Sequence, residues 1–524
     1  MQSGTKRKPT YKQMAFETAV RNPERYIGFL SALKDFEGKI LNDENLLEIV
    51  SHLYLIEEVK SNEITILETT QISDIQNKVI EVNKTRRADG GFPTGYQSRF
   101  WTYMRTPSEL GFVFAQYGKN FRFSDIAKKL ISGEIDEQEA FSIQAIKYNR
   151  KSPYRNVSND FNFFRFILEV LLKLKDKNKS LSYEQFIVAM FSQNGDVNEF
   201  LSIIENNKFN DYEAVYEFVK KNFQAITKIK TITQDYPDVV RRLFIISGFI
   251  SIRYSGKKLI QINENKFEYI QKLLETEFFL SDNEKTDPQS YFNKLNTKND
   301  ELINLVRKNS ESDRVDGATY TNKIFDIIKN YNIDENVITE SIEKIGTRQT
   351  VIKEFKEIPD PLKLEFYISI LIALKYGNDF SIRPNYKADH IGKPYSHAPG
   401  NKGDIEIYSS TIYWLIEVTL IRNKTQQLNH ETTSVVRHLS SNEEFKSNLI
   451  KYLSFIAPVI HEDTKEFYDF SVINNIQKEG FVNMKPYTLE SFVETTLKQE
   501  NFSDMEEYTE SVISHFKTNL SFLN

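Results

Sequence analysis

Two carboxylates lie thirteen positions apart in neighbouring strand-like segments. The stretch from Gly403 to Leu420 reads GDIEIYSSTIYWLIEVTL, in which Asp404 opens an alternating polar and apolar run. Glu417 lies inside the next run, which is rich in β-branched and aromatic residues. A carboxylate in such a strand is costly to bury unless a charged partner meets it. A lysine or arginine would make a structural ion pair, whereas a divalent metal held by both acids would make a catalytic centre.

A third acid precedes this pair on a segment with helical spacing. The run PLKLEFYISILIALKYG carries one glutamate, Glu365, and its neighbours one turn away are apolar. A carboxylate on a buried stripe needs a charged partner. Glu365 is therefore either half of a structural ion pair or a member of the same site.

A polar stripe follows the second strand. Residues 424–439 read KTQQLNHETTSVVRHL and are predicted to be helical, which places Lys424, Glu431 and His438 nearly over one another. Such a stripe is typical of a solvated face. This one begins soon after Glu417, however, so it can also face the same site. Five of the seven histidines lie between residues 390 and 461, which adds titratable groups to this region.

Length and composition limit the class of protein. A chain of 524 residues is too long for one core and predicts about three or four domains. The absence of cysteine excludes disulfides, thiol catalysis and cysteine-ligated zinc. The N-terminal basic residues are not followed by an apolar core, so no signal peptide is expected. The longest apolar runs are too short to cross a membrane, and we therefore expect a cytoplasmic protein.

Basic residues are distributed unevenly along the chain. The net charge of −5 argues against a uniformly basic nucleic-acid binder. Between Lys78 and Lys129, however, ten Lys and Arg stand against four Asp and Glu, among many aromatic residues. We interpret residues 1–150 as a first DNA-recognition subdomain. Its candidate DNA contacts are Arg86, Arg87, Arg99 and Arg105.

Residues 151–280 are predicted to form a second recognition subdomain. Its helical segments are followed by LFIISGFISIRYSGKKLIQI, which reads as two strands around a glycine turn. Helices followed by a hairpin with a basic tip indicate a winged-helix-like subdomain. Lys257 and Lys258 at the tip are then candidate DNA contacts. The alternative is an ordinary surface hairpin with solvated lysines.

The rest of the chain divides into a connector and a separate fold. Residues 281–345 are polar but keep helical spacing, which predicts a helical linker. Residues 346–524 contain the helix of Glu365, the strand pair and further helices, which predicts a C-terminal α/β domain. The predicted fold class is multidomain α+β, with a helical N-terminal recognition region ahead of the linker.

Taken together, the acids resemble the PD-(D/E)xK nuclease pattern. In that pattern a helix glutamate and two strand acids gather Mg²⁺ beside the scissile phosphate. The spacing of Asp404 and Glu417 fits it, and Glu417-Val418-Thr419 occupies the (D/E)xK position. Two departures stand out, because Gly403 replaces the proline and Thr419 replaces the lysine.

The wider sequence resembles the AlwI family of type IIS restriction endonucleases, which includes nicking enzymes. The resemblance rests on EVT in place of ExK, on Glu431 seven residues before His438, on PERYIGFLSALKDFEGKIL and on the aromatic and basic block. It implies winged-helix recognition subdomains and a C-terminal PD-(D/E)xK cleavage domain. It further implies Mg²⁺-dependent cleavage of double-stranded DNA a few base pairs outside a short asymmetric site. By position, the site residues are Glu365, Asp404 and Glu417 as metal ligands, with Glu431 and His438 behind them.

The chemistry of phosphodiester hydrolysis suits this assignment. Mg²⁺ prefers hard oxygen ligands and keeps several waters, so two or three carboxylates suffice. Histidine titrates near neutral pH, which makes His438 the candidate for part of the role of the missing lysine. Lys424 is the alternative.

Two other functions stay open from the sequence. One is a sequence-specific DNA-binding protein with an inactive nuclease domain. The other is a repair or transposon nuclease, which would share the catalytic core but would not cut at a fixed distance. One domain has one active site, so cleavage of both strands would need a transient dimer, a second subunit or two successive events.

Overall fold

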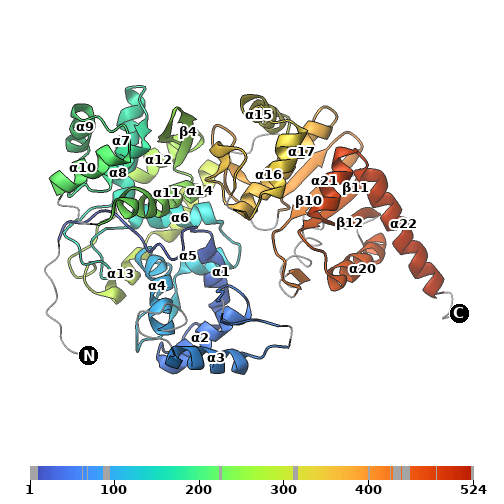
Figure 1. Ribbon diagram of the computed structural model, residues 1–524, viewed down its shortest axis with the longest axis horizontal. Helices are drawn as coiled ribbons and strands as arrows, with labels where there is room; N and C mark the ends of the chain where they lie inside the picture. Colours follow the sequence, from blue (N-terminus) through green and yellow to red (C-terminus); the bar gives the residue numbers. More distant parts are fainter. Residues whose placement is uncertain are drawn as a thin grey trace. The chain divides into compact units, whose positions relative to one another are not determined.

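The structure is a computed structural model with two compact units, Met1–Glu311 (unit 1) and Ser312–Asn524 (unit 2). It describes residues 10–520 except 62, 68, 86–94, 224–226, 311–316, 348, 399–401, 425–426, 429–437, 439–448 and 479–480. Figure 1 labels many of the helices and some of the strands of both units. Within the described residues, no helix is long and apolar enough to cross a membrane.

Unit 1 is mainly helical and shares one hydrophobic core from Met14 to Val306. Its helices are α1 (Arg25–Ala32), α2 (Asp43–Leu55), α3 (Ile72–Thr85), α4 (Tyr96–Glu109), α5 (Asp125–Ile131), α6 (Glu137–Lys147), α7 (Phe163–Asp176), α8 (Tyr183–Ala189), α9 (Val197–Asn206), α10 (Tyr212–Phe223), α11 (Tyr236–Ile246), α12 (Phe267–Glu275), α13 (Pro288–Leu295) and α14 (Asn299–Ser310). A π-helical turn, η2 (Thr231–Asp235), leads directly into α11, and the 3-10 turns are η1 (Lys34–Phe36) and η3 (Glu264–Lys266). The helices α5 and α6 begin at side-chain caps, Ser124 and Asp136.

The helix α6 lies at the centre of this core. All eleven of its residues are buried, including charged ones such as Glu137 and Lys147. A helix that is buried on every side cannot present a face to DNA. The pair α5 and α6 therefore forms part of the core rather than an exposed helix-turn-helix.

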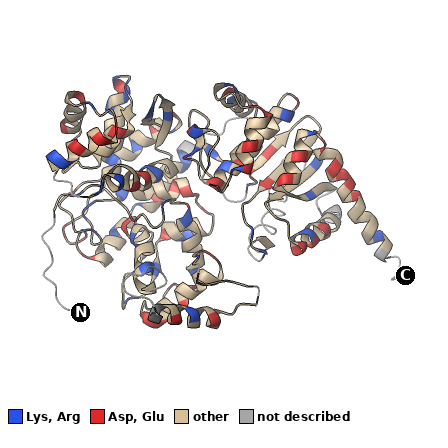
Figure 2. Cartoon of the chain, in the orientation of Figure 1, with Lys and Arg blue, Asp and Glu red and all other residues tan. Residues whose placement is uncertain are grey.

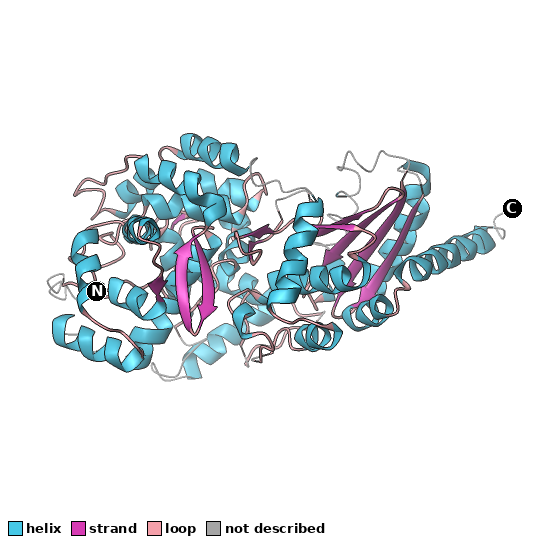
Figure 3. Cartoon of the chain, turned by 90° about the horizontal axis from the view of Figure 1, so that it is seen from above, coloured by secondary structure: helices cyan, strands magenta, loops and turns pink. Residues whose placement is uncertain are grey.

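Unit 1 also contains a small three-stranded antiparallel sheet. Its strands β3 (Leu181–Ser182), β4 (Ile250–Ser255) and β5 (Lys257–Ile262) lie in the order β3-β5-β4. The predicted hairpin is present, because β4 and β5 pair around Gly256, whose φ of +65° suits glycine at the turn. Figure 3 shows this hairpin as a projecting pair of strands beside the helices of unit 1. A second, two-stranded pair joins β1 (Val113–Phe114) to β2 (Arg122–Phe123).

The segment expected to be a helical linker is divided between the units. Helix α13 packs against β1, and α14 packs against α6 and α12, all within unit 1. The next two helices, α15 (Gly317–Asn330) and α16 (Glu335–Glu343), pack within unit 2 against β6 (Ser381–Pro384) and α17 (Asp360–Tyr376). The predicted helices are present, but residues 281–345 do not form a body of their own.

Lys147 fastens α13 and α14 to the central helix. Its Nζ donates to the carbonyl oxygens of Leu295, at 2.6 Å, and Thr297, at 3.3 Å, and to Oδ1 of Asn299, at 2.6 Å. The side chain is buried, and burial lowers the pKa of Lys147 from 10.5 to about 7.

Unit 2 is built around a five-stranded sheet of order β12-β11-β10-β9-β6. The strands β9 (Ile405–Tyr408), β10 (Ile412–Val418), β11 (Ile450–Ala457) and β12 (Val482–Thr488) follow β6 along the chain, and β7 (Lys387–Ala388) pairs separately with β8 (Pro394–Ser396). The strands β10, β11 and β12 are parallel, whereas β9 is antiparallel to both β10 and β6. The remaining elements are η5 (Lys353–Phe355), α20 (Glu462–Lys478), α21 (Leu489–Leu497) and α22 (Asn501–Leu520). Figure 3 shows helices flanking this sheet.

The two faces of the sheet are buried against different helices. On β10, Trp414 and Ile416 belong to the same core cluster as α17 and α21. The alternate residues, Tyr413 and Leu415, belong to a cluster with Tyr468 of α20. Period-2 alternation in β10 therefore assigns each side chain to one of two covered faces. Burial on both faces explains why this strand is almost continuously apolar.

We expect a fragment that ends at residue 311 to be more stable than one that ends at residue 282. The shorter fragment lacks α13 and α14, and with them the buried side chains Leu302, Ile303 and Val306. The core residues of unit 1 that pack against these side chains would then be exposed to water. The lost burial should lower the free energy of unfolding by at least about 4 kcal/mol. Thermal and chemical denaturation of the two fragments measure this difference. Equal stability would mean that α13 and α14 do not belong to the core of unit 1.

The stability of unit 1 should also depend on pH through Lys147. Because its pKa is about 7 in the folded chain and 10.5 as a reference value, unfolding takes up a proton between these pH values. The free energy of unfolding should therefore rise with pH in this window, by at most about 1.4 kcal/mol per pH unit. Chemical denaturation at pH 7 and pH 9 should show a larger increase for the wild type than for Lys147→Met. A smaller increase for the wild type would contradict this origin.

Candidate active site

The pairing of β9 with β10 brings the two strand acids together. Ile405 lies opposite Ile416 in this antiparallel pair, and one further step of the same register places Asp404 opposite Glu417. Opposite residues of an antiparallel pair share a face of the sheet. The backbone N–H of Val418 donates to Oδ2 of Asp404 at 2.8 Å, which fixes this half-buried carboxylate against β10.

The start of β9 is also tied to the neighbouring strand. Asn385, directly after β6, donates its backbone N–H to the carbonyl oxygen of Asp404 at 2.8 Å. Its Nδ2 donates to the carbonyl oxygen of Gly403 at 2.7 Å. These two bonds and the bond from Val418 hold Asp404 from both sides.

Glu417 meets a histidine. Its side chain is buried, with 5% of the residue exposed, and Oε1 lies 2.7 Å from Nδ1 of His438. When the Glu417 carboxylate is ionised it only accepts hydrogen bonds, and Nδ1 of His438 then carries the hydrogen. A neutral imidazole then has its lone pair at Nε2. His438 therefore contacts Glu417 through Nδ1. Its catalytic role stays a prediction.

Gly403 replaces the proline of the motif for a steric reason. A Cβ at this position would lie 2.8 Å from Oε1 of Glu417 and would overlap Cδ1 of Leu415. Any side chain at this position would therefore require the ends of the Leu415 and Glu417 side chains to shift. Glycine lets the backbone approach the carboxylate closely.

A further acid of this strand, Glu406, is satisfied by tyrosines. It lies two residues after Asp404 on the same face of β9 and is buried. The hydroxyl of Tyr408 donates to Oε2 at 2.8 Å, and that of Tyr413 donates to Oε1 at 3.1 Å. Glu406 is thus a structural acid beside the candidate site, and the alternation of DIEI in the sequence places it there.

Glu365 forms a second glutamate–histidine pair. It lies on the buried helix α17, and its Oε1 is 2.5 Å from Nδ1 of His397, which follows β8. Its Oε2 is buried and makes no hydrogen bond within the part of the chain that the structure describes. The clustering of histidines in the sequence was the one available signal for His397, which sequence reasoning did not assign.

The structure does not bring all three predicted metal ligands into one cluster. Helix α17 packs with the Trp414 and Ile416 face of the sheet, whereas Glu417 is on the opposite face of β10. Across the described residues, no group of three or more His, Asp or Glu side chains is arranged to hold a metal ion. Asp404 lies opposite Glu417, which contacts His438, and Glu365 contacts His397. The role of Glu365 as a metal ligand stays a prediction.

The other predicted residues of this region have different surroundings. Glu431 lies outside the described residues. Nζ of Lys424 forms an ion pair with Asp463 at 3.1 Å. Thr419, at the motif's lysine position, is buried, and its Oγ1 accepts from the backbone N–H of Ile421 at 3.2 Å. The threonine hydroxyl therefore accepts a hydrogen bond from the nearby backbone. The basic side chain that contacts Glu417 is His438.

Most of the sequence, from residue 108 to residue 495, matches a known family. A model of the AlwI restriction endonuclease family matches residues 108–313 and 289–495, which together cover more than half of the chain. The chain belongs to the AlwI restriction endonuclease family. It is therefore a site-specific deoxyribonuclease and binds DNA, as the acids of β9 and β10 led us to expect.

Two solved structures resemble parts of this family member. The small subunit (R.BspD6I2) of the heterodimeric restriction endonuclease R.BspD6I is 20% identical over 36% of this chain and 99% of its own, with a TM-score of 0.25. The BpuJ1 endonuclease binding domain, in complex with pyrene- and phenanthrene-modified DNA, is 15% identical over 51% of this chain and 95% of its own, with a TM-score of 0.27. No match was found among curated protein sequences.

The DNA contacts expected in this restriction endonuclease are distributed over unit 1. Arg86 and Arg87 lie outside the described residues. Arg99 is exposed and stacks on Tyr103, with its guanidinium carbon 5.1 Å from the ring centroid, whereas Arg105 pairs with Glu17 at 2.7 Å. At the hairpin tip Lys257 is exposed, and Nζ of Lys258 lies 4.5 Å from the ring centroid of Tyr183. Whether these residues touch DNA stays a prediction.

The aromatic and basic block is not one continuous surface. Its aromatic side chains are largely buried in the core, as are Phe100, Phe112, Phe121 and Phe123. Several of its cations are paired with acids, as in Lys128 with Glu37 and Lys129 with Glu134. Figure 2 shows acidic residues interspersed with basic ones over the helices of unit 1. The aromatic residues of this block therefore build the core of unit 1.

The steric role of Gly403 gives a test of the site. We expect Gly403→Ala to lower the rate of DNA cleavage about tenfold, because the added methyl group forces the ends of the Leu415 and Glu417 side chains to shift beside His438. DNA affinity should stay within about twofold, since the change is confined to unit 2. Cleavage kinetics and gel-shift titrations on the same protein measure both quantities. Wild-type cleavage by Gly403→Ala would show that the position of Glu417 does not matter.

Proposed function

We propose that the chain is a type IIS enzyme that uses Mg²⁺ to cut DNA a few base pairs outside a short asymmetric site. The observation that carries the proposal is the placement of Asp404 opposite Glu417 across β9 and β10, with His438 bonded to Glu417. In this proposal unit 1 recognises the site and unit 2 cleaves.

The acids of β9 and β10 suit a hard divalent cation. Carboxylate oxygens are the ligands that Mg²⁺ prefers, and it needs only one or two of them because it keeps several waters. Asp404 and Glu417 would hold the ion. The buried Oε2 of Glu365 is a further oxygen donor that makes no hydrogen bond with the described residues. When bound, the cation would supply charge neutralisation at the phosphate and a lower pKa for the attacking water.

The protein's own groups would orient this site. The N–H of Val418 keeps the Asp404 carboxylate beside β10, and His438 keeps that of Glu417 in place. With its hydrogen at Nδ1, His438 presents Nε2 as the atom that accepts a proton from a water molecule. His438 would thus replace the lysine of the motif, whose position is occupied by Thr419 in this chain. Glu431 would stand behind His438.

Recognition and cleavage in separate units would explain cutting outside the site. Part of unit 1 runs from a helix through a short strand to two further helices and ends in the hairpin. Along the chain these elements are α7, β3, α8, α11, β4 and β5, and α9 and α10 are inserted between α8 and α11. This order and the sheet order β3-β5-β4 support a winged-helix-like subdomain. One cleavage centre per chain cuts one strand at a time. Cutting both strands would then need a transient dimer, a second subunit or two successive events, and a single event would nick the DNA.

Incubation with plasmid DNA tests this function. We expect cleavage with Mg²⁺, none with EDTA, and cut ends at a fixed distance from one short sequence. Cuts at scattered positions would contradict a type IIS enzyme. Cleavage of equal rate in EDTA would contradict the metal.

Charge removal at the two acids should abolish cleavage and spare DNA binding. Asp404→Asn and Glu417→Gln keep the shape of each side chain but remove the charge that a cation needs, so we expect a loss of about a thousandfold or more. Affinity for DNA and the melting temperature should stay close to those of the wild type. Full activity of Asp404→Asn in Mg²⁺ would refute the metal site.

Glu406→Gln is the matched control. Glu406 lies on the same strand and face as Asp404 and is also buried, but tyrosine hydroxyls satisfy it. We expect this variant to lose stability by about 1 kcal/mol and to keep its cleavage activity. Equal inactivation of all three variants would mean that general damage to the sheet, and not loss of metal ligands, explains the effect.

A further inference from the structure

The helix α11 and the turn before it carry a partly exposed stripe of mostly charged side chains. Asp235, Asp238, Arg242 and Ile245 are all partly exposed and lie at spacings of three, four and three along the helix and the turn before it. The residues between them are largely buried in the core of unit 1. This stripe is therefore the face that α11 presents outward.

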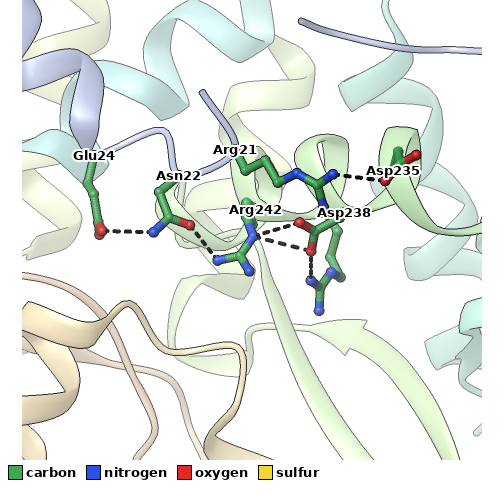
Figure 4. Close-up of polar contacts among 7 residues, drawn as sticks. Arg21, Asn22, Glu24, Asp235, Asp238 and Arg242 are labelled. Carbon is green, nitrogen blue, oxygen red and sulfur yellow. Dashed lines mark hydrogen bonds and ion pairs between the residues drawn. The ribbon is translucent and has the colours of Figure 1, made fainter. Parts of the chain in front are cut away.

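Two residues from the start of the chain extend this stripe. Nη2 of Arg21 pairs with Oδ1 of Asp235 at 2.9 Å, although 214 positions separate them. Nη1 of Arg242 donates to Oδ1 of Asn22 at 2.6 Å. Figure 4 shows these side chains converging from the N-terminal segment and α11. We refer to Arg21, Asn22, Asp235, Asp238 and Arg242 as the α11 cluster.

Asp238 fixes the guanidinium of Arg242 in this cluster. Nε of Arg242 lies 3.2 Å from each oxygen of Asp238. The same acid accepts from Nη2 of the buried Arg241 at 2.5 Å, so its own position is anchored in the core. A guanidinium held at Nε and Nη1 has a fixed plane, and Nη2 of Arg242 makes no hydrogen bond to any described residue.

The position of α11 in the chain adds a second argument. It is the last helix before the β4–β5 hairpin, and the sheet order β3-β5-β4 joins this hairpin to the start of α8. In helix-turn-helix proteins the helix at the end of the motif enters the major groove, which admits one helix. The outward stripe of α11 would then face base edges.

We infer that the α11 cluster reads bases, with Arg242 as the side chain that recognises a guanine in the major groove. This inference rests on the proposed function, in which unit 1 recognises a specific DNA sequence. A planar guanidinium recognises O6 and N7 of guanine through two N–H donors. Arg21, which is half exposed at the edge of the cluster, is the second donor to the same groove.

The composition of the cluster favours base edges over phosphates. Asp235 and Asp238 lie on the same stripe as Arg242, and their negative charge opposes the close approach of a phosphate. Base edges, in contrast, carry donors as well as acceptors, and an aspartate can accept from the amino group of cytosine. A surface of mixed donors and acceptors with fixed geometry suits sequence readout, whereas a phosphate contact needs only positive charge.

Selection from a randomised DNA duplex pool tests this inference on the full-length chain, with EDTA present to prevent cleavage. We expect Arg242→Ala to lower affinity for the sequence selected by the wild type about tenfold to a hundredfold. Its own selected sequence should lose preference at one or two adjacent base pairs that contain guanine. Affinity for a scrambled duplex should stay within about twofold of the wild type.

Further variants separate the outcomes. Arg242→Lys keeps the charge but loses the planar fork, so it should lose the same base preference; Arg307→Ala, at a half-exposed arginine on α14, should change neither quantity. Equal loss on selected and scrambled DNA by Arg242→Ala, with affinity restored by Arg242→Lys, would make Arg242 a phosphate contact and overturn the inference. An unchanged motif and affinity in both variants would also overturn it. Failure of the wild type to select any sequence would instead refute the proposed function.

Discussion

The antiparallel register of β9 and β10 is the constraint on which the candidate active site depends. Asp404 and Glu417 share a face because Ile405 pairs with Ile416, and a slip by one residue would turn one acid to the other side of the sheet. Such a slip is costly here, since both faces of β10 are buried against different helices. The hydrophobic cores of unit 2 therefore fix the geometry of its polar site.

Part of this arrangement could be predicted from the sequence because its signals are local. Alternation in the run after Asp404 identified β9, the β-branched run identified β10, and the glycine turn identified the β4–β5 hairpin. The contact of Glu365 with His397 spans 32 positions and depends on how β8 returns to α17, which no local pattern reveals. Gly403 appeared as a departure from the motif, and its close approach to Glu417 gives the physical reason.

The surface of unit 1 was harder to predict because composition does not distinguish a core from a binding surface. The many aromatic residues between Lys78 and Lys129 fill the core of unit 1, and Arg105 is paired with an acid 88 positions away. The charged stripe of α11 becomes recognisable only when the buried face of that helix is known. The buried residues thus decide which charged side chains remain available to a partner.

The central claim is that Asp404 and Glu417 hold a divalent cation. Anomalous X-ray diffraction from crystals of the full-length chain grown with Mn²⁺ in place of Mg²⁺ tests it most directly. The account predicts an anomalous peak about 2.1 Å from a carboxylate oxygen of each residue. A chain that cleaves DNA in Mn²⁺, but shows its peak at other residues or none between β9 and β10, would contradict it.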